Sequence, residues 1–504
     1  MTNSKKKLYT TLFDTSVIKK DVNKRSIKSG IANLSSQSFI FLITIIRAAI
    51  LARLLTPEDY GIFTMAVVIS GFVLIFKDLG LSTATIREKE ITHAQVSNLF
   101  WLNTFIGILS MVLVCATAPL LVWFYHDQRV AAVAYSLSPG FFFAGLTVQH
   151  QALLKRQMMF DKLAVINVSS SIASSLVGIF IAWIYSNYWA LVWMQVIQNF
   201  FVMLGTWYSA RWRPSPPRFN AGTKKLIKVG LDVAGLNAFS TITKQLDKVI
   251  AGRIVGAVPL GLYCKGQQIP NLIAGQFRMA IFVVALPALS ALQGEPEKFA
   301  DYYHKFQSAV CWITMMLSAL CFVFAEEIIM LYFGPKWAGS VLFMRILSIQ
   351  TFIMPAITTM DQIPLALGFS RRYLLGGMCR SIILVIGMIL IAPFYGIAGI
   401  ALWLALSDLV AFYPFARLCL KHSPVQIKRY LTTLLLPAVT GILLCIIFCY
   451  LKQYVFFDSM ISQVGLMLLF MFSAIGIYSF FDMFEVNGTF GLWHSINSKI
   501  KNPI

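Results

Sequence analysis

RAAILARLLTPEDYGIFTMAVVISGFVLIFKDLGLSTATIREKEITHAQVSNLFWLN, residues 47–103, is the stretch that decides the fold of this chain. An apolar segment ends at Arg53, the letters TPED of residues 56–59 turn the chain, and a second apolar segment runs from Tyr60 to Leu81. Proline fixes one backbone angle of the turn, and the acidic pair is expected to keep the turn in water. The pattern therefore predicts a tight hairpin of two membrane helices.

The same hairpin recurs 200 residues later in the chain. At one unbroken offset, four residues of the first copy have counterparts in the second: Gly30, Arg53, Gly61 and Phe63 correspond to Gly230, Arg253, Gly261 and Tyr263. The matches fall on Arg and Gly rather than on the abundant Leu and Ile, which favours duplication over chance similarity. Repeats of this size build many transporter folds.

Composition places the whole chain in the membrane. Of 504 residues, 58% are hydrophobic and only 12% are charged, and the mean hydropathy is +0.73. A soluble protein has about a quarter of its residues charged, so the sequence predicts a multi-pass membrane protein. Its net charge of +21 comes from Lys and Arg in alternate short loops, as the positive-inside rule requires, so no nucleic-acid partner is expected.

Apolar runs of about 20 residues predict an all-α polytopic membrane protein with about fourteen transmembrane helices. Two of the runs are over-long and contain prolines, where kinks or breaks are expected. The predicted spans are 28–52, 60–80, 97–124, 131–153, 163–185, 187–210, 227–252, 258–291, 307–332, 338–366, 373–393, 396–416, 430–451 and 461–481.

The repeat and a basic, proline-rich linker divide the chain. We predict a cytoplasmic basic tail, an N-lobe of six helices, the linker, a C-lobe of six helices, and two extra C-terminal helices whose role the sequence does not give. Six helices per lobe is an even number, so the lobes should be related by a pseudo-two-fold axis along the membrane normal. The predicted bounds are 1–27, 28–210, 211–226, 227–420 and 421–504.

Loop charge predicts the orientation. With both termini in the cytoplasm, most Lys and Arg outside the helices lie on the inside, and the tail before the first apolar run is polar and basic, so no cleaved signal peptide is expected. The loops predicted to lie outside contain only Arg53, Arg129, Arg253, Lys336 and Lys452.

Signatures of an enzyme are missing from the sequence. No GxxxxGK[ST] loop is present, the six histidines show no metal-ligand spacing, and no predicted outer loop is long enough to form a catalytic domain. We therefore expect neither an enzyme nor a metal or organic cofactor. A coupling ion, H⁺ or Na⁺, stays open.

Basic residues within predicted helices are the most informative chemistry. An ionisable side chain at the bilayer centre is costly, so it normally faces protein or water. One interpretation is structural: Arg47 and Asp247, which are equivalent in the repeat, form a salt bridge. The other is a cationic cavity suited to pyrophosphate and acidic sugars. Six residues are candidates for such a cavity: Arg47, Lys244, Lys248, Lys265, Arg278 and Arg380.

Two further sets of polar residues lie within predicted helices. Glu326 and Glu327, near an outer helix end, are expected to be solvated. The buried acids are candidates for ion coupling or for salt bridges: Asp232, Asp247, Asp361 and Asp408. An amide cluster beside Pro270 suits a bendable, sugar-facing segment better than simple packing: Gln267, Gln268 and Asn271.

Several motifs resemble those of one bacterial family. Residues 54–61 (LLTPEDYG) with 78–81 (DLGL) resemble the first hairpin of Wzx-type polysaccharide flippases, in the superfamily that also holds drug/cation antiporters and the lipid II flippase. Residues 86–91 with 100–103, and 333–337 (FGPKW), further resemble the colanic-acid-exporter branch. The resemblance covers most of residues 28–420 and does not identify the sugar.

The resemblance implies a multi-pass protein of the bacterial inner membrane. It would translocate undecaprenyl-diphosphate-linked oligosaccharide repeat units by alternating access, in contact with membrane lipids and with a polysaccharide polymerase and a chain-length regulator as expected partners. The alternatives are a drug/cation antiporter of the same fold, which would need acids in its cavity, and a membrane-embedded glycosyltransferase or polymerase. A non-transporting scaffold is a third alternative, against which the retained basic residues argue.

Overall fold

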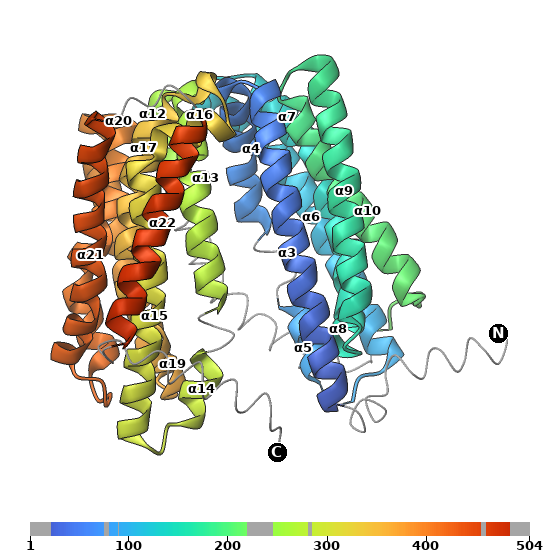
Figure 1. The fold of residues 1–504 in the computed structure, drawn as a ribbon. Helices are drawn as coiled ribbons and strands as arrows, with labels where there is room; N and C mark the ends of the chain where they lie inside the picture. Colours follow the sequence, from blue (N-terminus) through green and yellow to red (C-terminus); the bar gives the residue numbers. More distant parts are fainter. Residues whose placement is uncertain are drawn as a thin grey trace. The chain divides into compact units, whose positions relative to one another are not determined.

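The structure of this chain, a computed structural model, describes residues 22–74, 80–88, 90–218, 245–280, 285–454 and 460–483 (Figure 1). Within these ranges the regular structure is helical and contains no strand. Among the described residues, ten helices are long and apolar enough to cross a membrane. The prediction of an all-α polytopic membrane protein is confirmed.

The chain forms two compact units, Met1–Gly261 and Leu262–Ile504. The division falls within a helix that begins at Ala257 rather than in the basic linker. The predicted lobe boundaries stay a prediction.

Unit 1 is a bundle whose helices follow the predicted hairpins closely. The span predicted at 131–153 is broken where Pro139 begins a new helix. The helices are α3 (Val22–Leu54), α4 (Pro57–Leu74), α5 (Leu81–Arg87), α6 (His93–Tyr125), α7 (Arg129–Leu137), α8 (Pro139–Arg156), α9 (Phe160–Tyr185), α10 (Trp189–Ala210) and α12 (Leu246–Val255), followed by the first turn of α13 (Ala257–Ala280).

The turn between α3 and α4 is stabilised by hydrogen bonds. The Asp59 carboxylate accepts from the backbone N–H of Thr56 at 2.9 Å and from its hydroxyl at 2.6 Å, while the Thr56 hydroxyl accepts from the Asp59 N–H. The other carboxylate oxygen accepts from the N–H of Tyr188 at 2.9 Å, just before α10. Asp59 is buried, so the expectation that both acids of the turn stay in water is wrong for this one. Its carboxylate satisfies helix-end N–H groups instead.

Buried polar contacts fasten α5 to its neighbours. The Thr85 hydroxyl donates to the Gln149 amide oxygen at 2.9 Å, and the Gln149 amide nitrogen donates to Asn103 at 2.9 Å. The Arg156 guanidinium donates to the carbonyls of Thr85 at 2.9 Å and of Glu88 at 2.5 Å, at the end of α5. These partners satisfy polar groups that lipid cannot.

The first part of the basic linker also lies on unit 1. The backbone N–H of Arg218 donates to the Asn98 side chain at 2.8 Å and its carbonyl accepts from it at 2.6 Å, while the Trp101 indole donates to the carbonyl of Ser215 at 2.8 Å. Trp212 is fully buried against Phe100. Residues 211–218 therefore belong structurally to unit 1.

Unit 2 contains the prolines predicted to interrupt the over-long spans, and one of them, Pro270, lies inside α13 without dividing it. The tenth predicted span breaks into three pieces before Pro355 and Pro364, as expected, and α20 contains two spans joined at Gly396, whose φ is 56°. The helices after α13 are α14 (Leu286–Ala291), α15 (Pro296–Val323), α16 (Ala325–Tyr332), η2 (Pro335–Trp337), α17 (Ser340–Ile353), α18 (Pro355–Thr358), α19 (Gln362–Ala366), α20 (Ser370–Leu420), α21 (Ile427–Tyr454) and α22 (Met460–Met483).

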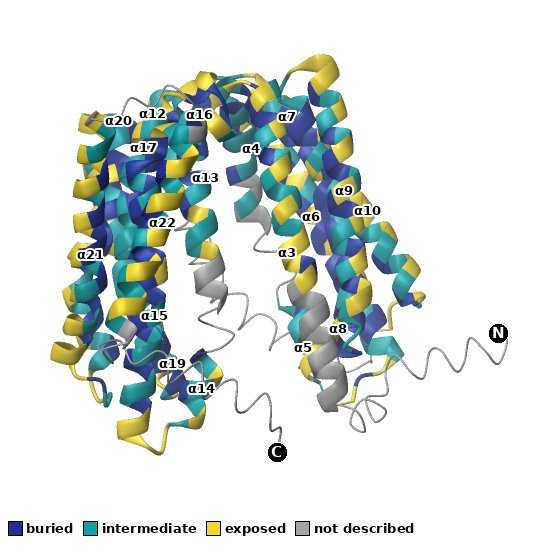
Figure 2. Ribbon diagram, viewed as in Figure 1, coloured by how far each residue is buried: buried dark blue, intermediate teal, exposed yellow. Residues whose placement is uncertain are grey.

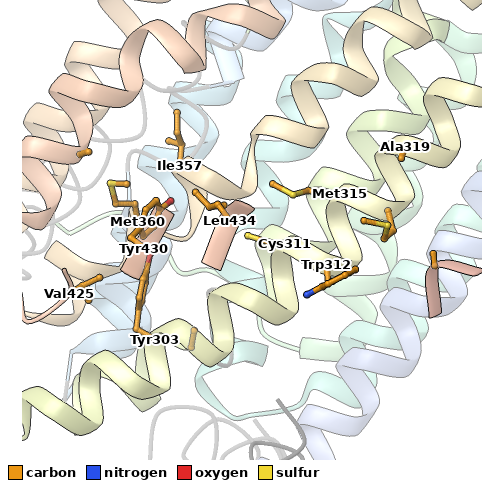
Figure 3. Packing of buried hydrophobic residues seen from close by; sticks show 14 of the residues in the cluster. Tyr303, Cys311, Trp312, Met315, Ala319, Ile357, Met360, Val425, Tyr430 and Leu434 are labelled. Atoms are coloured by element: carbon orange, nitrogen blue, oxygen red, sulfur yellow. The ribbon is translucent and has the colours of Figure 1, made fainter. Parts of the chain in front are cut away.

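The two C-terminal helices are part of the core of unit 2. Tyr303 and Trp312 of α15 lie in one buried cluster with Tyr430 of α21, as Figure 3 shows, and Phe470 of α22 belongs to the same cluster. At the far end of α21, Lys452 pairs with Glu327 and donates to the carbonyl of Val323 at 3.1 Å. The expectation that Glu327 is solvated is wrong, because its side chain is only 13% exposed.

The repeat at an offset of 200 is visible inside unit 1. Helix α3 ends at Leu54 and α4 begins at Pro57, while α12 ends at Val255 and α13 begins at Ala257. A Cβ added to Gly61 would lie 1.9 Å from the carbonyl oxygen of Ala257, and one added to Gly261 would lie 1.8 Å from the carbonyl oxygen of Pro57. At the offset of 200, Pro57 is equivalent to Ala257 and Gly61 is equivalent to Gly261. The contact of Gly61 with Ala257 therefore has an equivalent in the contact of Gly261 with Pro57, as expected for two segments related by a two-fold axis.

Candidate functional site

Helix α13 carries five of the predicted site residues, and their surroundings differ along its length. Gly266 packs against α17 so closely that a Cβ would lie 2.7 Å from the Cβ of Phe343. Gln267 is buried and donates to the hydroxyl of Tyr263 at 3.2 Å. Gln268 is half-buried, and Asn271, one turn beyond Gln267, is exposed; Figure 2 shows exposed residues among half-buried ones toward the lower end of the described part of α13. The three predicted sugar contacts therefore differ in burial.

Lys265 is buried among aromatic rings. Its Nζ lies 4.7 Å from the ring centroid of Phe333 and 5.3 Å from that of Trp337, and it donates to the Gln268 amide oxygen at 3.2 Å. The residue is 3% exposed. Both rings come from the FGPKW motif, so the motif provides a cation–π cage for the charge of α13. Such contacts stabilise a desolvated cation by about 2 kcal/mol.

Arg380 meets an acid rather than open space. Its Nε lies 2.6 Å from Oδ1 of Asp408, and its Nη2 lies 2.8 Å from Oδ2. The two residues thus form a bidentate ion pair within α20. The Asp408 side chain is 3% exposed and that of Arg380 is 26% exposed. Asp361, just before α19, also contributes to the electrostatic field at Arg380. This geometry supports the salt-bridge interpretation of Asp408.

The remaining predicted residues of unit 1 lie on α3 and α12. Arg47 is half-buried and donates to the hydroxyl of Ser175 on α9 at 3.5 Å. Asp247 is buried on α12. Lys248 is half-buried, and its Nζ lies 3.4 Å from the Gln245 amide oxygen. Asp232, Lys244 and the side chain of Arg278 lie outside the described residues.

Sequence reasoning missed several buried polar residues. Arg156 was assigned to a loop, although its guanidinium caps α5. Ser174 donates to the Gln198 amide at 2.5 Å between α9 and α10. Single Ser and Gln residues do not show from the sequence which helix will supply their partner, and the position of Arg156 at a helix end resembles that of an ordinary interface residue.

Comparison with known proteins decides the family. Residues 50–342 match the family described as "Polysaccharide biosynthesis protein", which is more than half of the chain. The chain belongs to this family. The matched range begins at the predicted hairpin and ends beyond the FGPKW motif.

Individual members of the family are similar at low identity. The chain is 23% identical to the teichuronic acid biosynthesis protein TuaB of Bacillus subtilis over 331 residues, which is 65% of this chain and 68% of TuaB. It is 23% identical to the lipopolysaccharide biosynthesis protein WzxC of Escherichia coli over 312 residues, 60% of this chain and 62% of WzxC. The chain thus matches about two thirds of these relatives' length. The resemblance to Wzx-type proteins is confirmed.

Solved structures of two transport proteins have a similar fold. The lipid II flippase MurJ in an inward closed conformation matches with a TM-score of 0.71 at 14% identity, over 90% of this chain and 98% of MurJ. An inward-facing MATE multidrug resistance transporter matches with a TM-score of 0.59 at 13% identity, over 82% of this chain and 98% of its own. At these identities the likeness concerns the fold alone.

Proposed function

We propose that this protein translocates lipid-linked oligosaccharide precursors of a polysaccharide across the bacterial inner membrane by alternating access. The observation that carries the proposal is the combination of membership in a polysaccharide biosynthesis family with the fold of a lipid II flippase. A polysaccharide precursor carries a large polar headgroup on a lipid. Such a headgroup needs a polar route through the membrane, because lipid cannot satisfy its hydrogen-bonding groups.

The polar groups of the described helices suit such a route. Half-buried Arg47 and Lys248 are cations that can meet a pyrophosphate, and Asn271 is an exposed amide that can meet sugar hydroxyls. The lipid carrier is undecaprenyl diphosphate in this proposal, and its tail stays in the bilayer. The termini are cytoplasmic, and a polymerase and a chain-length regulator take up the product on the outer side.

The energy source in this proposal is an ion gradient or the membrane potential. A coupling H⁺ or Na⁺ is part of this proposal, and Asp408, which is bound to Arg380, is not its site. The chain itself catalyses no covalent step. A drug/cation antiporter of the same fold is the alternative, and such a protein would accumulate organic cations outside the cell rather than move a lipid-linked sugar.

Complementation of a deletion strain tests this function. Loss of the gene should cause lipid-linked repeat units to accumulate on the cytoplasmic face, and the wild-type chain should restore polysaccharide export. Lys248→Gln should keep normal protein levels with reduced export. Lys265→Gln should lower protein levels, because its amide cannot replace the cation–π contacts with Phe333 and Trp337. Normal lipid-linked pools in the deletion strain, together with drug sensitivity, would instead favour the antiporter.

A further inference from the structure

One side of α13 differs from the surfaces of the apolar helices. Gln268, Asn271 and Gly275 follow each other at intervals of three and four residues, so they lie on one face. Asn271 and Gly275 are exposed, whereas residues 259–267 are buried or half-buried. The exposed part of this face thus carries an amide and a glycine, with a second amide at its edge.

Lipid-facing surfaces of the same protein look different. Helix α6 exposes Phe105, Leu109 and Leu113, and α22 exposes Phe472 and Phe480. These are the large apolar side chains that contact with lipid tails favours. On α13 the exposed side chain is instead the amide of Asn271, whose hydrogen-bonding groups lipid cannot satisfy. We therefore take this amide face as water-facing rather than lipid-facing.

Gly275 marks open space on this face. A Cβ added to Gly275 would meet nothing within 4 Å, whereas one added to Gly266 of the same helix would lie 2.7 Å from Phe343. Glycine at position 275 is therefore not required by packing within the described residues. It leaves room beside Asn271 that no described residue fills.

We propose that Gln268, Asn271 and Gly275 form the surface along which the sugar headgroup of the cargo passes, and that Gly275 sets the headgroup size that is accepted. This inference rests on the proposed function. Amide side chains both donate and accept hydrogen bonds, which matches the hydroxyl groups of a carbohydrate and does not match a lipid tail or an organic cation. Gln267, one turn before Asn271, is buried and bonded to Tyr263, so it does not touch the cargo.

The test inserts bulk at Gly275 and at a matched glycine. Gly476 of α22 also has nothing within 4 Å of an added Cβ, but it lies between exposed Phe472 and Phe480, four residues away on each side. Leucine has a higher helix propensity than glycine, so neither Gly275→Leu nor Gly476→Leu should lower protein levels. We expect Gly275→Leu to reduce polysaccharide export at least tenfold and Gly476→Leu to leave it unchanged.

Smaller changes make the test graded. Gly275→Ala should reduce export less than Gly275→Leu does, and Asn271→Gln should retain more export than Asn271→Leu. Wild-type export by Gly275→Leu, or an equal loss in Gly275→Leu and Gly476→Leu, would overturn the inference while leaving the proposed function intact, because the wild-type chain still restores export. A wild-type chain that restores no export would instead overturn the proposed function.

Chemical labelling gives a readout that does not depend on transport. In membranes, a charged thiol reagent should modify the Gly275→Cys variant, located by mass spectrometry, at least tenfold faster than the Gly476→Cys variant. Thiolates react in water and not in lipid, so the ratio reports which glycine faces water. Equal labelling of the two variants would overturn the assignment of this face of α13 whatever the export assay shows.

Discussion

Replacing Gly61 with alanine places a methyl group where α4 has no room for one. The new Cβ would lie 1.9 Å from the carbonyl oxygen of Ala257, whereas a carbon and an oxygen normally approach to about 3.3 Å. The first turns of α4 and α13 must therefore separate by about 1.4 Å. Gly261→Ala demands nearly the same displacement, because its Cβ would lie 1.8 Å from the carbonyl oxygen of Pro57.

The energetic effect follows from two opposing terms. Overpacking of this kind destabilises the folded protein by about 1–3 kcal/mol. The higher helix propensity of alanine relative to glycine stabilises it by about 1 kcal/mol. We expect each single variant to be destabilised by about 1 kcal/mol, which lowers the melting temperature of a unit of this size by roughly 2–4 °C. The same separation of α4 from α13 relieves both clashes. The double variant should therefore lose about as much stability as either single variant.

Thermal melting of the purified protein in detergent measures this effect, and spin labels at Glu58 and Val258 report the separation. Gly71→Ala on the same helix is the control, because its Cβ would lie 3.8 Å from Gln245, an ordinary contact. It should be neutral or slightly stabilising. Additive losses in the double variant, or a Gly61→Ala variant as stable as the control, would refute the reciprocal contact.

Three further predictions concern charges. Arg380→Gln should lower protein levels by leaving the buried Asp408 carboxylate without its ion pair, a cost of about 3–5 kcal/mol, whereas Arg380→Met combined with Asp408→Leu should restore them on immunoblots. Hydrogen bonds from Arg129 lower the pKa of the Asp127 carboxyl in the folded protein. These bonds stabilise the fold fully above the unfolded-state pKa of about 3.9, and this stabilisation is lost as the pH falls through the lower folded-state pKa. Arg129→Gln should therefore reduce the melting temperature slightly at about pH 6, and this reduction should shrink as the pH falls through the lowered pKa of Asp127; a reduction that does not change with pH would contradict this. Reporter fusions to the basic linker and to the α3–α4 turn should report opposite sides of the membrane.

The parts of the fold that sequence predicted are those with a strong local signal. Proline and glycine marked the α3–α4 turn and the breaks before Pro355 and Pro364, because these residues restrict or free the backbone wherever they occur. The repeat was visible because Gly61 and Gly261 are required by close backbone contact. Hydropathy predicted the membrane helices because each spanning helix must itself contain about 20 mostly apolar residues, whatever its neighbours are.

Side-chain partners were much harder to predict. Lys265 and Arg380 carry the same hydropathy signal as a cavity cation, yet one lies beneath aromatic rings and the other on a carboxylate 28 residues away. Asp59 was placed in water because turns usually are, although Tyr188, 129 residues distant, brings an N–H to it. Such partners depend on which helices become neighbours, and no local pattern records that.

The buried cations of unit 2 already have partners within the protein, which makes them less suited to contact a cargo. Burial of a cation in a membrane protein requires an anion, an aromatic surface or water. Lys265 has the aromatic surface, Arg380 has the anion, and both are thereby fixed within unit 2. Asn271 of α13 is a neutral amide and is exposed. A cargo rich in hydroxyl groups is therefore better matched to the exposed amide of α13 than to Lys265, the cation buried on the same helix.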